Sequence, residues 1–222
     1  MPFAMTHLII AKKISDKYSG CVKSLPQFYL GSIAPDAVHN RVNYVSDYKK
    51  HSHLITGTEK WGMTTENDKW KNNVLEFLYK HKNSNNRDFV LGYCVHVLTD
   101  LNNNIVLWTP FREQYFKERD WEYDNIHHRE SEKIDIELAL SYDERHIFWE
   151  NLKMSNSVDL PDYVYASEID NQKNLILNEW YINKERPDVS LNEVRTYTLE
   201  MEFIKNTADY IDAIFKSSIV ID

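Results

Sequence analysis

The stretch that decides the fold is DFVLGYCVHVLTDLNNNI, residues 88–105. Hydrophobic side chains fill almost every position from Phe89 to Leu98, which predicts a helix running through the protein interior. His96 and Asp100 lie four residues apart, and the 3.6-residue helical turn places both on one face. Because a buried carboxylate needs a cation or hydrogen-bond donors, this pair predicts part of a metal site.

The composition is that of an ordinary globular protein. The chain has 222 residues, 42% of them hydrophobic and 27% charged, with only five Gly and six Pro. This length suits a single domain over residues 1–222 with a sizeable core. A net charge of -8 argues against a stable complex with nucleic acid, although bound divalent cations can still attract a phosphate-ester substrate.

Cysteine usage and the first residues limit the type of metal site and the location. Cys21 and Cys94 are too few for a disulfide framework, and no CxxC pair is present for a thiolate zinc site. The beginning, MPFAMTHLIIAKKI, carries no signal-peptide pattern, and no window approaches the ~18 apolar residues of a membrane span. We therefore expect a cytoplasmic protein without a transmembrane segment, whose metal ligands are nitrogen and oxygen atoms.

Helical spacing recurs along the chain without strand alternation, so we expect an all-α fold. Thr6 is the expected N-cap of the first helix. Residues 25–36 form an apolar segment that we expect to end in an irregular turn at Asp36, and residues 37–65 form a long connection without periodic structure. The expected helices cover residues 6–18, 66–82, 88–105, 111–118, 166–182 and 190–217, with one more from residue 124 through residue 152.

Several other side chains have both a structural and a functional interpretation. His7 in the first turn of its helix, and His51 and His53 in the long connection, are either solvated or metal ligands. Asp36 follows an apolar segment, where a carboxylate either caps a turn or binds a ligand.

A second group of polar residues lies on a later helix. His128, Glu132 and Asp135 occur at i, i+4 and i+7 and share one stripe. On a charged helix such a stripe is either a solvated face or a set of ligands. Asp135 stands between two isoleucines, which favours a buried position for it.

Four short motifs together resemble bacterial zinc-dependent phospholipase C, a family related by fold to the S1/P1-type nucleases. They are THLIIAKKI from residue 6, LGSIAPDAV from residue 30, SHL from residue 52 and GYCVHVLTD from residue 92. The resemblance extends to about residue 140 and rests on the order and spacing of the motifs. It implies a single-domain multi-helix bundle of the phospholipase C / P1 nuclease type.

The resemblance also implies a zinc site that this sequence completes. Its four ligands are Asp36, His53, His96 and Asp100.

The resemblance further implies that His7 reaches a neighbouring ion, which Asp100 bridges, and that His128 with Glu132 serves another. Two features depart from the family. Its enzymes begin, after processing, with a Trp whose amino group is a ligand, and they carry a His shortly after the HxxxD pattern. This chain begins Met-Pro and has three Asn residues at 102–104. The expected number of zinc ions therefore runs from one to three.

The resemblance, together with the chemistry of such ligands, implies a phospholipase C-like phosphodiester hydrolase that uses zinc-activated water on a phospholipid or a small phosphate ester. Asp36 is the expected catalytic base. No P-loop, GxSxG or HExxH motif supports a competing chemistry. Two alternatives stay open. One is a nuclease of the same fold, and the other is a non-catalytic helical protein with one structural metal, because four protein ligands close a zinc site.

Overall fold

The structure is a computed structural model, and it describes residues 3–115 and 120–218. Over these residues the fold is all-α, as predicted, with no strand and one isolated bridge between Leu160 and Val164. The α-helices are α1 (Ala4–Lys17), α2 (Leu25–Gly31), α3 (Ser46–Ser52), α4 (Asn67–His81), α5 (Arg87–Asn103), α6 (Thr109–Tyr115), α7 (Asp120–Ser141), α8 (Arg145–Met154), α9 (Ala166–Asn178) and α10 (Tyr197–Ser218). Two 3₁₀ helices, η1 (Pro35–Asn40) and η3 (Val189–Leu191), and a π-helical turn, η2 (Asn104–Trp108), complete the elements.

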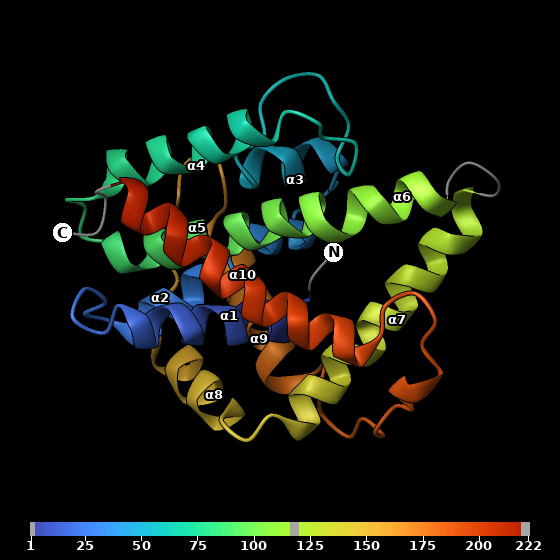
Figure 1. The fold of residues 1–222 in the computed structure, drawn as a ribbon. Helices are drawn as coiled ribbons and strands as arrows, with labels where there is room; N and C mark the ends of the chain where they lie inside the picture. The colour runs from blue at the N-terminus through green and yellow to red at the C-terminus, as the bar shows by residue number, and fades with distance from the viewer. Residues whose placement is uncertain (1–2, 116–119, 219–222) are drawn as a thin grey trace.

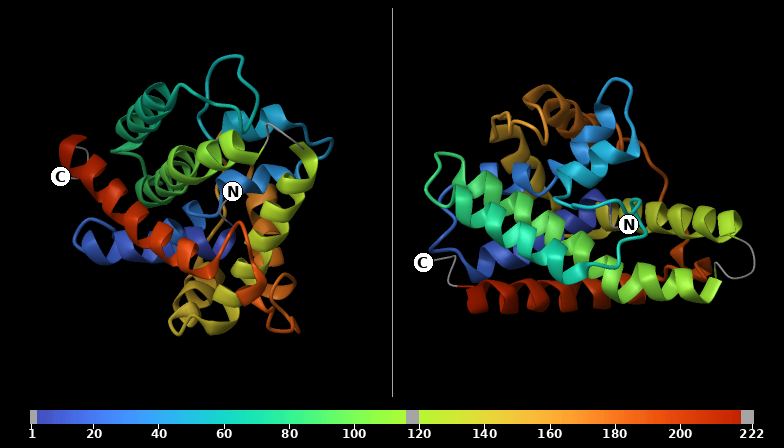
Figure 2. Two further views of the ribbon diagram at one scale, coloured as in Figure 1. Left: turned by 45° about the vertical axis from the view of Figure 1, so that its right-hand side comes forward. Right: turned by 90° about the horizontal axis from the view of Figure 1, so that it is seen from above.

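Helix α5 lies at the centre of the bundle, and α1, α2, α4 and α10 pack around it (Figure 1). Residues 89–103 of α5 are all buried, which explains why this segment has almost no polar face. Helix α4 runs beside α5, and α10 lies along the outside of the bundle (Figure 2). His96 and Asp100 are therefore carried by the most enclosed helix of the described chain.

Two glycines let α2 and α5 approach each other closely. A Cβ atom on Gly31 would lie 2.0 Å from the Phe89 carbonyl oxygen, and one on Gly92 would lie 1.9 Å from that of Phe28. Only glycine allows backbones this close. The crossing brings the end of α2, and with it Asp36 on η1, next to the middle of α5.

Helix α1 begins earlier than predicted, at Ala4, and Thr6 is not its N-cap. Thr6 lies inside the helix, where its hydroxyl donates to Glu200 Oε1 of α10 at 2.6 Å. The capping acceptor comes from α7 instead, because Asp135 Oδ1 accepts the backbone N–H of Met5 at 2.8 Å. A contact from a distant segment of the chain thus supplies the hydrogen-bond acceptor that the sequence analysis expected from Thr6.

The prediction of an unstructured connection over residues 37–65 is wrong in part, since η1 continues to Asn40 and α3 occupies Ser46–Ser52. Asp36 accordingly lies on a 3₁₀ helix rather than on an irregular turn. Both elements are short, and each packs against the other. Their stability comes from this packing, which a search for helical periodicity does not detect.

The helix expected from residue 124 through residue 152 is in fact two helices, α7 and α8, which part at residues 142–144. The guanidinium of Arg145 donates to the carbonyl of Ala139 in the last turn of α7. This contact satisfies a carbonyl that the helix itself leaves unpaired.

None of the helices over residues 3–115 and 120–218 combines the length and the hydrophobicity that a membrane crossing requires.

Candidate metal centre

Five potential metal ligands meet at the inner end of the α2–α5 crossing. They come from four segments: His7 from α1, Asp36 from η1, His53 from the end of α3, and His96 with Asp100 from α5. The four other than Asp36 are at most 3% exposed. The Asp36 side chain is 19% exposed and borders a cavity.

The Nε2 atoms of His53 and His96 each lie near an oxygen of both carboxylates. His53 Nε2 lies 3.1 Å from Asp100 Oδ2, 3.3 Å from His96 Nε2 and 3.5 Å from Asp36 Oδ1. His96 Nε2 lies 3.9 Å from an oxygen of each carboxylate. Asp36, His53 and His96 each offer a ligand atom within 4.8 Å of the other two, which is spacing suited to one metal ion. Asp100 is grouped with His7 and His96 instead.

The orientation of both imidazoles is fixed by backbone carbonyls. His96 Nδ1 lies 2.8 Å from the Ser32 oxygen, and His53 Nδ1 lies 2.9 Å from the Lys49 oxygen. Because a carbonyl only accepts, each Nδ1 carries the hydrogen and each Nε2 is directed at the cluster. Metal-binding histidines are commonly held by such a second hydrogen bond.

The backbone around His53 is also held on both sides. His53 directly follows α3 as its C-cap, and the next residue, Leu54, has a left-handed conformation with φ of 60°. The Leu54 N–H donates to the His51 carbonyl, and the Trp70 indole donates to the carbonyl of His53 at 2.7 Å. A buried leucine in a conformation that usually favours glycine indicates that the surrounding packing enforces this turn.

His7 belongs to an adjoining group with His96 and Asp100. Its Nε2 lies 3.6 Å from Asp100 Oδ1, the oxygen that does not face His53. Within residues 3–115 and 120–218, neither ring nitrogen of His7 has a hydrogen-bond partner. A small cavity of about 40 Å³ borders His7, His96 and Asp36, which is enough room for an ion or a water molecule. The unpaired atoms and this space fit a cation.

Asp100, like His7, is buried without a hydrogen-bond partner for its polar atoms among the described residues. Neither of its oxygens accepts a hydrogen bond of good geometry from the described residues, although His53 Nε2 lies 3.1 Å from one of them. A buried ionised carboxylate without hydrogen bonds destabilises the folded state unless a positive charge neutralises it. A divalent ion among these ligands would supply that charge.

Burial and neighbouring charges set the protonation of the centre. Burial lowers the pKa of His7 and of His96. Burial also opposes charge on His53, but Asp100 and Asp36 outweigh it and raise the pKa of His53. The same histidines, with Lys49 beside Asp36, overcome burial and hold the pKa of both carboxyl groups below its usual range. These shifts favour ionised carboxylates and protonation of His53, and metal binding competes with that proton.

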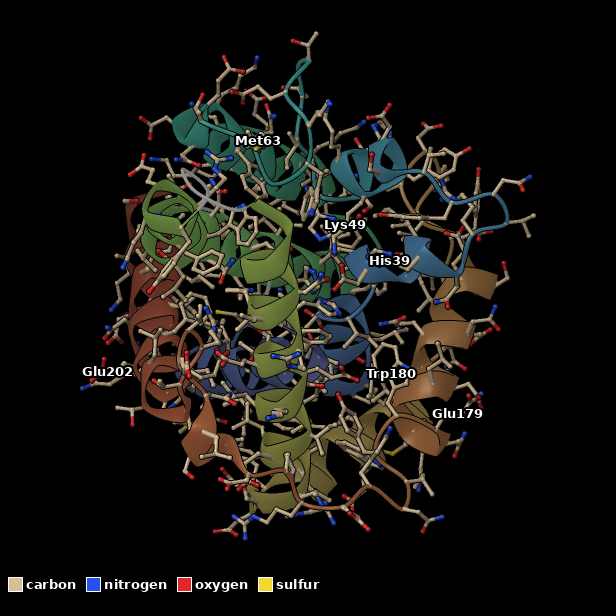
Figure 3. The ribbon with its side chains drawn as sticks, turned by 90° about the vertical axis from the view of Figure 1, so that its right-hand side faces the viewer. His39, Lys49, Met63, Glu179, Trp180 and Glu202 are labelled. Carbon is tan, nitrogen blue, oxygen red and sulfur yellow. The ribbon has the colours of Figure 1, made fainter. Side chains whose placement is uncertain are left out.

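The cluster lies at the edge of a cavity of about 500 Å³. Asp36 and Asp100 border it, as do Lys49 from α3 and His39 from η1. Figure 3 looks onto this side of the molecule, where His39 and Lys49 lie close together and Trp180 lies below them. Aromatic side chains form much of the remaining wall: Phe3, Tyr44, Trp61, Trp70, Trp108 and Trp180.

The structure does not bring His128 and Glu132 into either ligand group. His128 borders the cavity, with its ring centroid 5.2 Å from that of Phe3, and is exposed. Glu132 is also exposed. Asp135, on the same stripe, is buried and accepts hydrogen bonds from Met5 N and from the Tyr181 hydroxyl, so it has a structural role.

Three residues of this region were not selected from the sequence. Lys49, His39 and His127 all border the cavity. The signals were present but weak: Lys49 precedes His53 by four residues, and His39 follows Asp36 by three. Nothing in the sequence distinguishes His127 from its neighbour His128.

Comparison with protein-family models, curated proteins and solved structures gave no significant match.

Proposed function

We propose that this chain is a metal-dependent phosphodiester hydrolase of the phospholipase C type. One observation carries the proposal. Asp36 and Asp100 each have an oxygen 3.1–3.9 Å from the Nε2 atoms of His53 and His96, on the edge of a cavity large enough for a small phosphate ester. Zinc suits this set, because imidazole nitrogens and carboxylate oxygens are its preferred ligands when thiolates are absent.

In this proposal each residue of the site has a separate role in catalysis. A zinc ion with a coordination position open to the cavity would lower the pKa of water toward neutrality and polarise phosphoryl oxygens. Ser32 and Lys49 hold the His96 and His53 rings through their carbonyls. Asp36, the most accessible carboxylate of the four-residue set, faces the cavity and takes a proton as general base. The aromatic wall excludes water from the substrate.

A second candidate is a non-catalytic protein with one structural metal. The observation that favours it is the position of His128 and Glu132 outside both ligand groups, because Asp36, His53, His96 and Asp100 on one ion would leave no coordination position for water. Under this alternative His7 has no ion of its own, and the cavity binds a ligand without reaction.

The test is turnover by the zinc-loaded chain. The panel contains a phosphocholine lipid, a chromogenic diester and single-stranded nucleic acid, so that it also covers a nuclease. We expect hydrolysis of at least one diester and its loss in Asp100→Ala. His146→Ala, which removes an exposed histidine on α8, is the matched control.

His128→Ala separates two forms of the proposal. If His128 serves a further ion, this variant loses turnover while keeping the metal of the four-residue site. No turnover of any diester by wild-type protein with zinc bound would support the structural-metal alternative instead.

A further inference from the structure

One lysine lies inside the candidate centre. Lys49 is 3% exposed, and its Nζ lies 2.7 Å from Asp36 Oδ1, 3.1 Å from His39 Nε2 and 4.9 Å from the centroid of the Trp61 ring. The same side chain borders the large cavity together with Asp36 and Asp100. A fixed ammonium group therefore lies beside the carboxylates that would hold a metal.

We propose that Lys49 binds the substrate anion, as the second positive charge beside a single metal ion, and that the two together select a monoanionic phosphodiester over a dianionic phosphomonoester. This inference rests on the proposed function, because it specifies the substrate class of the same site.

Formal charges favour a monoanion. Asp36 and Asp100 contribute two negative charges, a divalent ion would neutralise them, and Lys49 leaves the centre with one positive charge. A diester monoanion balances that charge, whereas a monoester dianion leaves an excess negative charge in an enclosed, largely apolar cavity. A second divalent ion would remove this preference, because the centre would then balance a dianion more easily.

The geometry gives Lys49 the capacity for a ligand. An ammonium group has three N–H donors. His39 Nε2 accounts for one of them. Asp36 Oδ1 forms an ion pair with the ammonium at 2.7 Å, and the ring of Trp61 supplies a face rather than a lone pair. Even with one donor directed at Asp36, one is left for an anionic oxygen in the cavity. Because the lysine stem is buried and its head is fixed by these neighbours, little side-chain entropy is lost when an anion binds.

The alternative is that Lys49 only positions Asp36. Two variants distinguish the roles. Lys49→Gln keeps a hydrogen-bond donor for Asp36 but removes the charge, and Lys49→Arg keeps the charge. Lys50→Gln is the matched control, since Lys50 is the next residue and its Nζ donates to the Gly57 carbonyl outside the centre.

The experiment is calorimetric titration of the zinc-loaded full chain with two small probes at pH 9: dimethyl phosphate, a monoanion whose integrity is checked by phosphorus NMR, and methylphosphonate, which is almost entirely dianionic at that pH. Zinc affinity is measured for every variant in a separate titration. We expect wild type to bind dimethyl phosphate at least about tenfold more tightly than methylphosphonate, and Lys49→Gln to lose about tenfold in dimethyl phosphate affinity, the size of a charge-assisted hydrogen bond. Zinc affinity should change little, and Lys49→Arg and Lys50→Gln should retain anion binding.

Unchanged dimethyl phosphate affinity in Lys49→Gln would overturn the inference. A parallel loss of zinc affinity in that variant would also overturn it, because Lys49 would then act only through Asp36. If Lys49→Gln does not fold, a Lys49→Arg variant that binds methylphosphonate as tightly as dimethyl phosphate overturns it equally. Lys49-dependent binding of dimethyl phosphate without any diester turnover would refute the hydrolase proposal alone.

Discussion

The imidazole rings of His7 and His96 stack face to face, with centroids 3.6 Å apart and planes 8° from parallel. Two stacked imidazolium ions would repel each other, and burial already disfavours charge on either ring. Burial lowers the pKa of His96, and the neighbouring His7 lowers it further. Both rings are therefore neutral near pH 7, which is the form that binds metals.

The stack allows a test of His7 that preserves packing. We expect His7→Phe to keep the ring contact and the fold, because phenylalanine has a similar shape and removes two buried nitrogens without partners in the described chain. The variant should still bind the first zinc ion and lose any second equivalent. Zinc stoichiometry by mass spectrometry under native conditions is the measurement. Loss of the first ion would place His7 in the main site.

Metal removal should destabilise the protein. With zinc at ~1,000 times its dissociation constant, binding to the native state alone contributes about 4 kcal/mol, or about 10 °C in Tm at roughly 2–4 °C per kcal/mol. Chelation should remove this difference. Thermal melts with zinc and with chelator, for wild type and His53→Ala, check it. The Tm of the variant should hardly depend on zinc. An unchanged Tm of wild type after verified zinc removal would contradict the assignment of a metal site.

Asp135 should make stability depend on pH. Burial raises its pKa from 3.8 to about 7, although the hydrogen bonds from Tyr181 and Met5 oppose this. Because the folded pKa is the higher one, the contribution of Asp135 is fully present below about pH 4 and is lost as pH rises through about 7. At roughly 1.4 kcal/mol per pKa unit, wild type should lose on the order of 2 kcal/mol between pH 5 and pH 8 relative to Asp135→Asn.

Urea unfolding of the metal-free protein at both pH values provides this comparison. Glu150→Gln, an exposed change on α8, is the control and should follow wild type, because Glu150 is not among the groups that shift the pKa of Asp135. Equal pH dependence in wild type and Asp135→Asn would exclude a raised pKa for this carboxyl group.

Gly92→Ala should weaken both the fold and the metal site. Its Cβ would meet the Phe28 carbonyl at 1.9 Å, so α2 and α5 must separate, at about 1–3 kcal/mol or more. The separation moves Ser32, whose carbonyl orients His96. We expect lower Tm and lower zinc affinity together. Gly20→Ala, where a Cβ meets nothing within 4 Å, is the control and should change neither Tm nor zinc affinity. Normal zinc affinity in a destabilised Gly92→Ala would show that metal binding does not depend on the close packing of α2 against α5.

The central helix and two of the ligands were predictable from local pattern alone. In an apolar helix, the four-residue spacing of His96 and Asp100 is enough to predict that both side chains lie on the same face, because a helical turn contains 3.6 residues. The grouping of Asp36 and His53 with this pair came from a resemblance of motifs, and in the structure both side chains have an atom within 3.9 Å of His96 Nε2. Zinc binding and hydrolysis are still predictions.

Other features depend on contacts between distant segments. The first turn of α1 is capped by Asp135 from α7, which no inspection of residues 1–18 could reveal. Lys49 lies in a stretch without periodicity, and its proximity to Asp36 requires the packing of α3 against η1. Tertiary packing decides such positions, so local propensity is a weak guide to them.

The tryptophans around the cavity should report ligand binding through a change in their fluorescence. Indole emission responds to the polarity of its surroundings, and Trp61, Trp70, Trp108 and Trp180 all face the same space. Any molecule that displaces water there alters their environment together, whereas Trp149 on α8 stays outside. The protein thus carries its own fluorescent reporter, with which collections of unlabelled phosphate esters can be screened before any reaction is known.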